Sequence, residues 1–151
     1  MSSKLFVASV VLALAVSTAR AEVVVRDAWV RGTVPGQSAT GAFMQLASPD
    51  DLSLIAVATP AAKVAEIHSM ALENGVMRMR AMDSLPLPAG KTVELRPGGY
   101  HLMLLELVAP LKEGDSVPVV LTFADKSGRK TTQEVKATVR ALTAGSAMPK
   151  H

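Results

Sequence analysis

Hydrophobic and polar positions alternate along the chain in short runs separated by clusters of Gly, Pro, Asn and Asp. After the first 21 residues these runs cover 23–31, 40–47, 52–59, 64–72, 76–82, 91–95, 100–108, 119–124 and 129–142. Runs of this length at this spacing are typical of antiparallel strands. The pattern predicts an all-β protein, an antiparallel β-sandwich or Greek-key barrel, with the proline-marked segment 85–90 as a loop.

One segment, 61–72, contains enough good helix formers to be helical on propensity alone. Asn74-Gly75 follows it directly and has apolar runs on both sides. This dipeptide is the strongest short-range signal for a β-hairpin. The turn therefore favours two strands here rather than a helix.

The N-terminus combines a basic start, an apolar run and small residues at Ala19 and Ala21. This order is typical of a secretory signal peptide, and the apolar run is shorter than the roughly 20 residues of a membrane span. We therefore expect residues 1–21 to be removed on export. Residues 22–142 would form one domain without a membrane span, and residues 143–151 a loose tail.

Composition limits the possible functions of the exported chain. The signal segment takes two of the 16 basic residues and none of the 13 acidic ones, so the formal net charge falls from +3 to +1. No basic stripe with interleaved aromatic residues is present, so nucleic acid is not an expected partner. The chain has no cysteine and eight methionines. Disulfides, thiol catalysis and the blue-copper site, which needs a cysteine sulfur, are excluded.

The hairpin predicts a cluster of metal-binding side chains. A two-residue turn pairs Met70 with Met79, and alternation of side chains then places His68, Met70, Met77 and Met79 on one face. His68 and Met79 become diagonal neighbours. A three-residue turn would move Met79 to the other face, because a slip of one residue exchanges the two faces.

His101 and Met103 form a second pair of nitrogen and sulfur ligands, because residues two apart on a strand point the same way. Convergence of the two pairs would give two imidazoles and two thioethers. Thioether sulfur is soft and selects Cu(I), whereas zinc more often takes thiolates, imidazoles or a carboxylate. The sequence thus predicts one Cu(I) bound by His68, Met79, His101 and Met103.

Other candidate residues have simpler interpretations. Methionines in strands usually fill gaps in a core, which suits Met44, Met70, Met77 and Met82, although Met70 could serve as a spare ligand. Trp29 and Tyr100 are expected to pack. Glu66 shares a strand face with His68 and is interpreted as solvent-facing or structural. Met148 and His151 in the tail are too few to define a site for Cu(II).

The spacing of the four candidate ligands, H-x10-M-x21-H-x-M, resembles the signature of the periplasmic copper(I) chaperones known as PCu(A)C proteins. Similar segments include Glu66-Ile67-His68, the Asn74-Gly75 turn and Pro97-Gly98-Gly99-Tyr100-His101. The resemblance runs from Ala28 to about Phe123. It implies a cupredoxin-like β-sandwich that binds Cu(I) near its surface in the periplasm.

The resemblance also implies partners. Family members deliver copper to haem-copper oxidases, notably towards the dinuclear Cu(A) centre in cytochrome c oxidase subunit II, often beside a Sco-type thiol protein. Copper storage or resistance is an alternative role. A metal-dependent enzyme would need an open coordination position with an acid or base, which the sequence does not supply, so no catalysis is expected. A metal-free interaction module remains the other alternative.

Overall fold

The structure, a computed structural model, describes residues 22–143, and ten strands make up the regular structure of this part of the chain. The predicted signal peptide and residues 144–151 of the predicted tail lie outside the described residues, so the domain boundaries stay predictions. No helix within 22–143 is long and apolar enough to cross a membrane. The strands are β1 Val24–Arg31, β2 Ala39–Ala47, β3 Leu52–Ala58, β4 Ala62–Glu73, β5 Val76–Met82, β6 Leu85–Leu87, β7 Thr92–Leu95, β8 His101–Leu107, β9 Ser116–Asp125 and β10 Lys130–Arg140.

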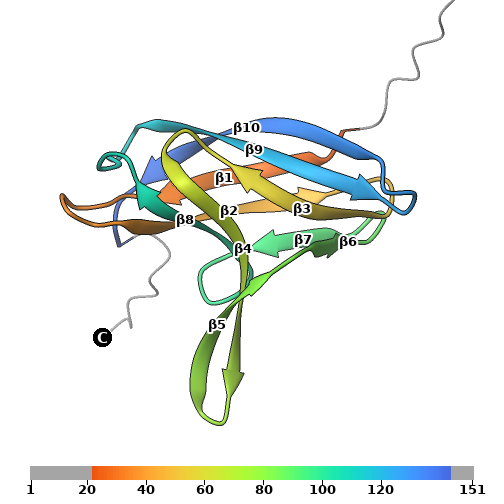
Figure 1. Cartoon of the computed structure of the whole chain (residues 1–151), viewed down its shortest axis with the longest axis horizontal. Helices are drawn as coiled ribbons and strands as arrows, with labels where there is room; N and C mark the ends of the chain where they lie inside the picture. The colour runs from red at the N-terminus through yellow and green to blue at the C-terminus, as the bar shows by residue number, and fades with distance from the viewer. Residues whose placement is uncertain (1–21, 144–151) are drawn as a thin grey trace, which may run out of the picture.

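The strands form one continuous hydrogen-bonded path that folds over on itself. Its order is β5-β4-β8-β2-β1-β10-β9-β3-β6, and β7 also pairs with β2. Every pairing is antiparallel except that of β1 with β10. β9, β10 and β3 lie over β1, β2 and β8, and the hairpin of β4 and β5 projects from the body as an arm (Figure 1). The predicted all-β sandwich is confirmed.

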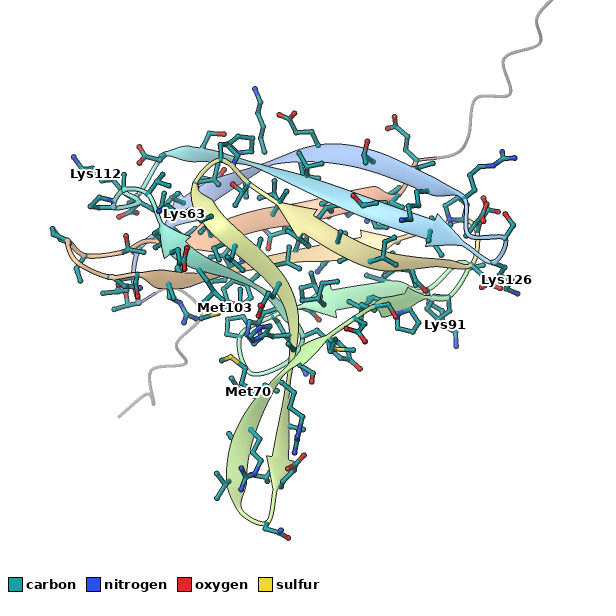
Figure 2. All side chains as sticks on the ribbon, viewed as in Figure 1. Lys63, Met70, Lys91, Met103, Lys112 and Lys126 are labelled. Atoms are coloured by element: carbon teal, nitrogen blue, oxygen red, sulfur yellow. The ribbon has the colours of Figure 1, made fainter. Side chains whose placement is uncertain are left out.

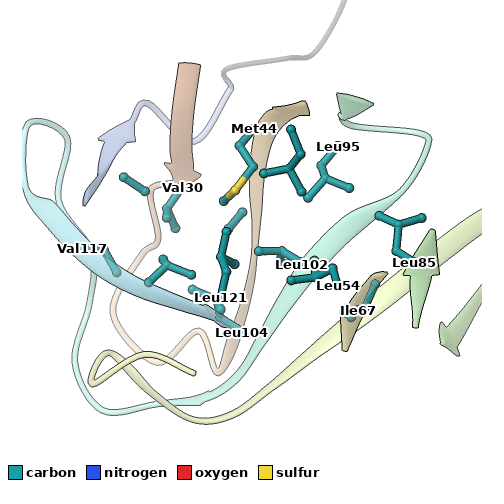
Figure 3. Packing of buried hydrophobic residues seen from close by; sticks show 14 of the residues in the cluster. Val30, Met44, Leu54, Ile67, Leu85, Leu95, Leu102, Leu104, Val117 and Leu121 are labelled. Atoms are coloured by element: carbon teal, nitrogen blue, oxygen red, sulfur yellow. The ribbon is translucent and has the colours of Figure 1, made fainter. Parts of the chain in front are cut away.

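The core lies between the two layers and accounts for the alternating pattern in the sequence. In β9 the residues Val117, Val119, Leu121 and Phe123 are buried while their neighbours are more exposed. Side chains from both layers meet in this core (Figure 3). Burial of alternate residues is what sets each strand's register, because a slip of one would expose the whole apolar set.

One predicted loop contains a strand. Leu85–Leu87 pairs with β3, with Pro86 opposite Ser53, and both leucines are buried. Proline cannot donate a hydrogen bond to a sheet, but β6 lies at the end of the hydrogen-bonded path. The prolines suggested a loop, whereas burial of the two leucines at a sheet edge stabilises a short strand.

The predicted hairpin is present with the predicted register. Glu73 pairs with Val76, so the turn consists of Asn74 and Gly75 alone. Both turn residues have positive φ, 50° and 79°, as a type I′ turn requires. Nearly all of segment 61–72 therefore belongs to strand β4, Ala62–Glu73, and the turn fixes which side chains share a face.

Candidate metal centre

All four predicted ligands lie on one face of β4, β5 and β8. His68 is the direct partner of His101, and Met79 is the partner of Met70, two residues further along β4. Met103 follows His101 by two residues, so strand alternation gives it the same face. The opposite face of these strands points into the core, where Ile67 and Leu102 are buried. The site is therefore on the outer face of the sheet, where the arm meets the sandwich.

Met70 and Met103 are close to this junction in Figure 2, with Met70 at the base of the arm. Met79 is 46 % exposed, whereas His101 is only 4 % exposed. The site thus has a buried side formed by β8 and an open side formed by the arm.

The two imidazole rings lie at a distance that one metal ion could bridge. Their centres are 5.6 Å apart and their planes are inclined by 58°. A ring nitrogen lies about 1.1 Å from the ring centre and a metal–imidazole bond is about 2.0 Å, so the limit for two rings on one ion is about 6.2 Å. The observed distance corresponds to a nitrogen–metal–nitrogen angle of about 130°. This angle leaves room for two further ligands.

His68 presents one nitrogen that has no other role. Its Nε2 lies 2.6 Å from Oε2 of Glu66. Because a carboxylate only accepts, Nε2–H is the donor when the ring is neutral, and Nδ1 then carries the lone pair. Nδ1 is buried and has no hydrogen-bond partner within the described residues. Buried polar atoms are almost always paired, so this nitrogen is a candidate ligand atom.

His101 shows the mirror arrangement. Its Nδ1 lies 3.0 Å from the carbonyl oxygen of Gly99, which accepts, so Nε2 is free to bind a metal. Burial lowers the pKa of His101, as do the charges of His68 and Arg31, while the hydrogen bond to Gly99 raises it. The balance keeps the imidazole neutral, which is the form that binds metals.

A hollow of about 240 Å³ lies beside the rings. Its lining includes His101, Met70, Met79 and Met103, but not His68. Gly41, the partner of Met103, also lines it, and a Cβ atom there would come within 2.7 Å of the Phe43 ring. Because Gly41 has no side chain, the hollow stays open at this point of β2, beside Met103.

The sequence predicted the four candidate ligands but not the residues that orient and surround them. Glu66 was expected to be structural or to face solvent, and it is 41 % exposed and accepts a hydrogen bond from the His68 ring. The sequence did not identify this specific partner, although its place two residues earlier on β4 was an available signal. Gly99 was equally close, two residues before His101, but its contact is made by a backbone carbonyl, which residue type does not reveal. Phe43 carried no comparable signal, because it reaches the site only through contacts across strands.

The two aromatic residues that were expected to pack, Trp29 and Tyr100, differ in burial. Trp29 packs as expected, buried and 4.5 Å from the Phe43 ring centre. Tyr100 does not, because it is 42 % exposed at the turn before β8.

Within residues 22–143, no three or more histidine, aspartate or glutamate side chains are grouped so that they could hold a metal ion without other ligands. A larger hollow of about 620 Å³ near the β9–β10 turn contains neither histidine nor methionine. Within the described part of the chain, the two histidines and the thioethers beside them are therefore the candidate ligands for a soft metal.

The fold is similar to those of solved copper-binding PCuAC domains. The copper-bound PCuAC domain from PmoF2 superposes with a TM-score of 0.63 at 20 % identity, covering 82 % of this chain and 96 % of that domain. The Cu(I) form of DR1885 from Deinococcus radiodurans is 32 % identical with a TM-score of 0.55, covering 78 % of this chain and 76 % of its own. The apo form of DR1885 covers 93 % of this chain at 31 % identity, with a TM-score of 0.57.

Sequence comparison agrees. The family model described as "Putative lipoprotein LpqE-like" matches residues 23–139. "Putative lipoprotein Lxx21020" of Leifsonia xyli subsp. xyli (strain CTCB07) is 32 % identical over 113 residues, which is 74 % of this chain and 68 % of that protein. The region matched by the family model contains β1 to β9, all of β10 except its last residue, and the four predicted ligands, and the chain belongs to the LpqE-like family of PCuAC domains.

Proposed function

We propose that this protein binds one Cu(I) ion through Nδ1 of His68, Nε2 of His101 and the sulfurs of Met79 and Met103. The observation that supports this most directly is the buried Nδ1 of His68, which has no partner within residues 22–143 and lies beside a second histidine with a free Nε2. Two imidazoles and two thioethers form a neutral, soft ligand set, which favours Cu(I) over harder or divalent ions.

The exposure of the ligands supports a carrier rather than a permanent store. Met79 is about half exposed, so ligands of a partner could approach the ion from the arm side while His101 still holds it from below. Transfer would then proceed by exchange of ligands, without free copper. Because the chain has no cysteine, copper binding and release involve no loss or gain of a thiol proton on this protein.

We propose further that the ion is delivered outside the cytoplasm to a haem-copper oxidase, at the Cu(A) centre of its subunit II. The signal-peptide pattern of residues 1–21 and the lipoprotein names of the relatives support export. The periplasm is the compartment in which we place this function.

The binding proposal is tested by titrating residues 22–151 with Cu(I) in competition with a chromogenic chelator. The parent protein is expected to bind one ion, and His68→Ala and Met79→Ala each to bind at least tenfold more weakly. Leu72→Ala, an exposed residue of the same arm, is the matched control and should bind like the parent. A parent that binds no Cu(I), or two site variants that bind as tightly as the parent, would contradict the proposal.

Delivery needs its own experiment. The Cu(I)-loaded protein is mixed with the soluble domain of an oxidase subunit II, the two are separated, and copper is measured in each. Copper should move to the oxidase domain from the parent protein. If free Cu(I) at the same concentration loads the oxidase domain equally fast, the delivery role is wrong even though copper binding stands.

A further inference from the structure

The arm formed by β4 and β5 has two chemically different faces beyond the sandwich. One face carries Glu73, Arg78 and Arg80, with the carboxylate of Glu73 paired to both arginines. The other face carries Leu72 opposite Met77, and Met70 opposite Met79. This second face bears no charge, and it is continuous with the face that carries His68 and His101.

Packing does not explain the methionines on this face. Met77 is 50 % exposed and Met79 is 46 % exposed, and β5 ends the sheet with no strand on its outer side within residues 22–143. A core methionine of this chain looks different, as Met44 does with an exposure of only 2 %. Two exposed thioethers on an arm whose other face is charged therefore suggest another role.

Three thioethers on this face lie close enough to share an ion. Direct partners such as Met70 and Met79 have Cβ atoms about 4.5–5.5 Å apart, and a diagonal pair such as Met70 and Met77 about 7–8 Å. Met77 and Met79, two apart on one strand, are separated by about 6.7 Å. A sulfur bound at about 2.3 Å puts the ion roughly 4.5 Å from its Cβ. All three sulfurs can reach one point above the arm.

We propose that Met70, Met77 and Met79 form a second, outer binding position for a soft monovalent cation, Cu(I) or its analogue Ag(I). The proposal rests on the proposed four-residue site and deepens it, because Met79 belongs to both positions. An ion held at the outer position by three thioethers moves inward by keeping its bond to Met79 and exchanging Met70 and Met77 for the two imidazoles and Met103. No electron is transferred and no proton is required.

The structure gives the two positions different exposure. His101 lies buried at the inner end, whereas Met77 pairs with Leu72, the second pair from the turn at the tip of the arm. Incoming ions and partner proteins therefore meet the outer position first. Arg78 and Arg80 project to the opposite face, since they pair with Ala71 and Ser69, so their charges do not crowd the cation.

The test uses Ag(I), which has no redox chemistry under these conditions, and NMR of methionine methyl groups labelled with carbon-13. In the wild-type protein the first equivalent of Ag(I) should shift the methyl signals of Met79 and Met103. In His68→Ala/His101→Ala, Ag(I) should still bind and should shift the methyls of Met70, Met77 and Met79, while Met44 stays unchanged as an internal control. Adding Met70→Leu/Met77→Leu to that background should lower the Ag(I) affinity at least tenfold, and adding Leu72→Ala should not.

The two proposals fail in different ways. If wild type binds no Ag(I) or Cu(I), the four-residue site is wrong, and the outer position that depends on it falls too. If wild type binds but Met70 and Met77 do not shift in the variant without histidines, the outer position alone is wrong. Should loss of the buried His101 prevent folding, His68→Ala/Met103→Leu serves instead, since leucine conserves the volume of methionine. The same shifts are then required.

Discussion

Glu66 offers the sharpest test of how the site is built, because the structure gives it two separable contributions. It accepts a hydrogen bond from Nε2 of His68, at 2.6 Å, and it carries a negative charge. The first contribution selects the tautomer that leaves Nδ1 free. Loss of such a partner behind a metal-bound imidazole typically weakens metal binding 10- to 100-fold, or about 1.4–2.8 kcal/mol.

The charge contributes less. Through the imidazole, the carboxylate would lie about 6.5 Å from the ion, where the attraction ranges from about 0.6 kcal/mol in bulk water to about 2.6 kcal/mol at the effective dielectric constant of about 20 typical near a protein surface. The Glu66 side chain is 41 % exposed, so water screens the charge and partly replaces the lost acceptor. We therefore expect Glu66→Gln, which keeps an acceptor, to weaken Cu(I) binding about fivefold, and Glu66→Ala about 30-fold.

The assay is Cu(I) competition with a chromogenic chelator at fixed pH and ionic strength. Glu113→Ala, an exposed carboxylate in the turn before β9, is the control for a change of net charge and should bind like wild type. Equal affinities for Glu66→Ala and wild type would refute the reasoning, because Nδ1 would then be available without its partner. Equal losses in the Gln and Ala variants would show that charge, not the hydrogen bond, is what matters.

Three further predictions follow from the same geometry. Insertion of one glycine after Gly75 moves Met79 to the opposite face, so Cu(I) affinity should fall at least tenfold while the melting temperature changes little; unchanged affinity would count against the strand-parity argument. Burial lowers the pKa of His101, so the copper-free protein should be most stable above the ordinary value of 6.5 and lose stability as the pH falls through 6.5 to the lowered pKa, measured as unfolding free energy in urea at several pH values. His101→Gln should flatten that dependence, and an equally steep curve would assign it to other groups. Gly41→Ala puts a methyl group against the Phe43 ring and should destabilise the fold by about 1–3 kcal/mol in the same assay, whereas a neutral effect would mean that the ring moves freely.

The sequence determined the hairpin and its faces. Asn74-Gly75 allows positive φ at both turn positions, and that local preference fixes the pairing of Met70 with Met79 without help from the rest of the fold. The buried alternation in β9 is equally local. For this hairpin and for β9, short-range rules were enough, and the prediction from the sequence was confirmed.

Only the tertiary structure decided which strands meet. His68 and His101 are 33 residues apart in the chain, and they become partners because β4 pairs with β8, a choice made by the packing of the whole core. The same applies to Gly41, whose missing side chain matters only because β2 lies on the other side of β8. Proline suggested a loop at Pro86, but burial of its neighbours at a sheet edge overrode that local signal. Local chemistry can be read from residues near one another in sequence, whereas contacts between distant strands depend on the free energy of the complete fold.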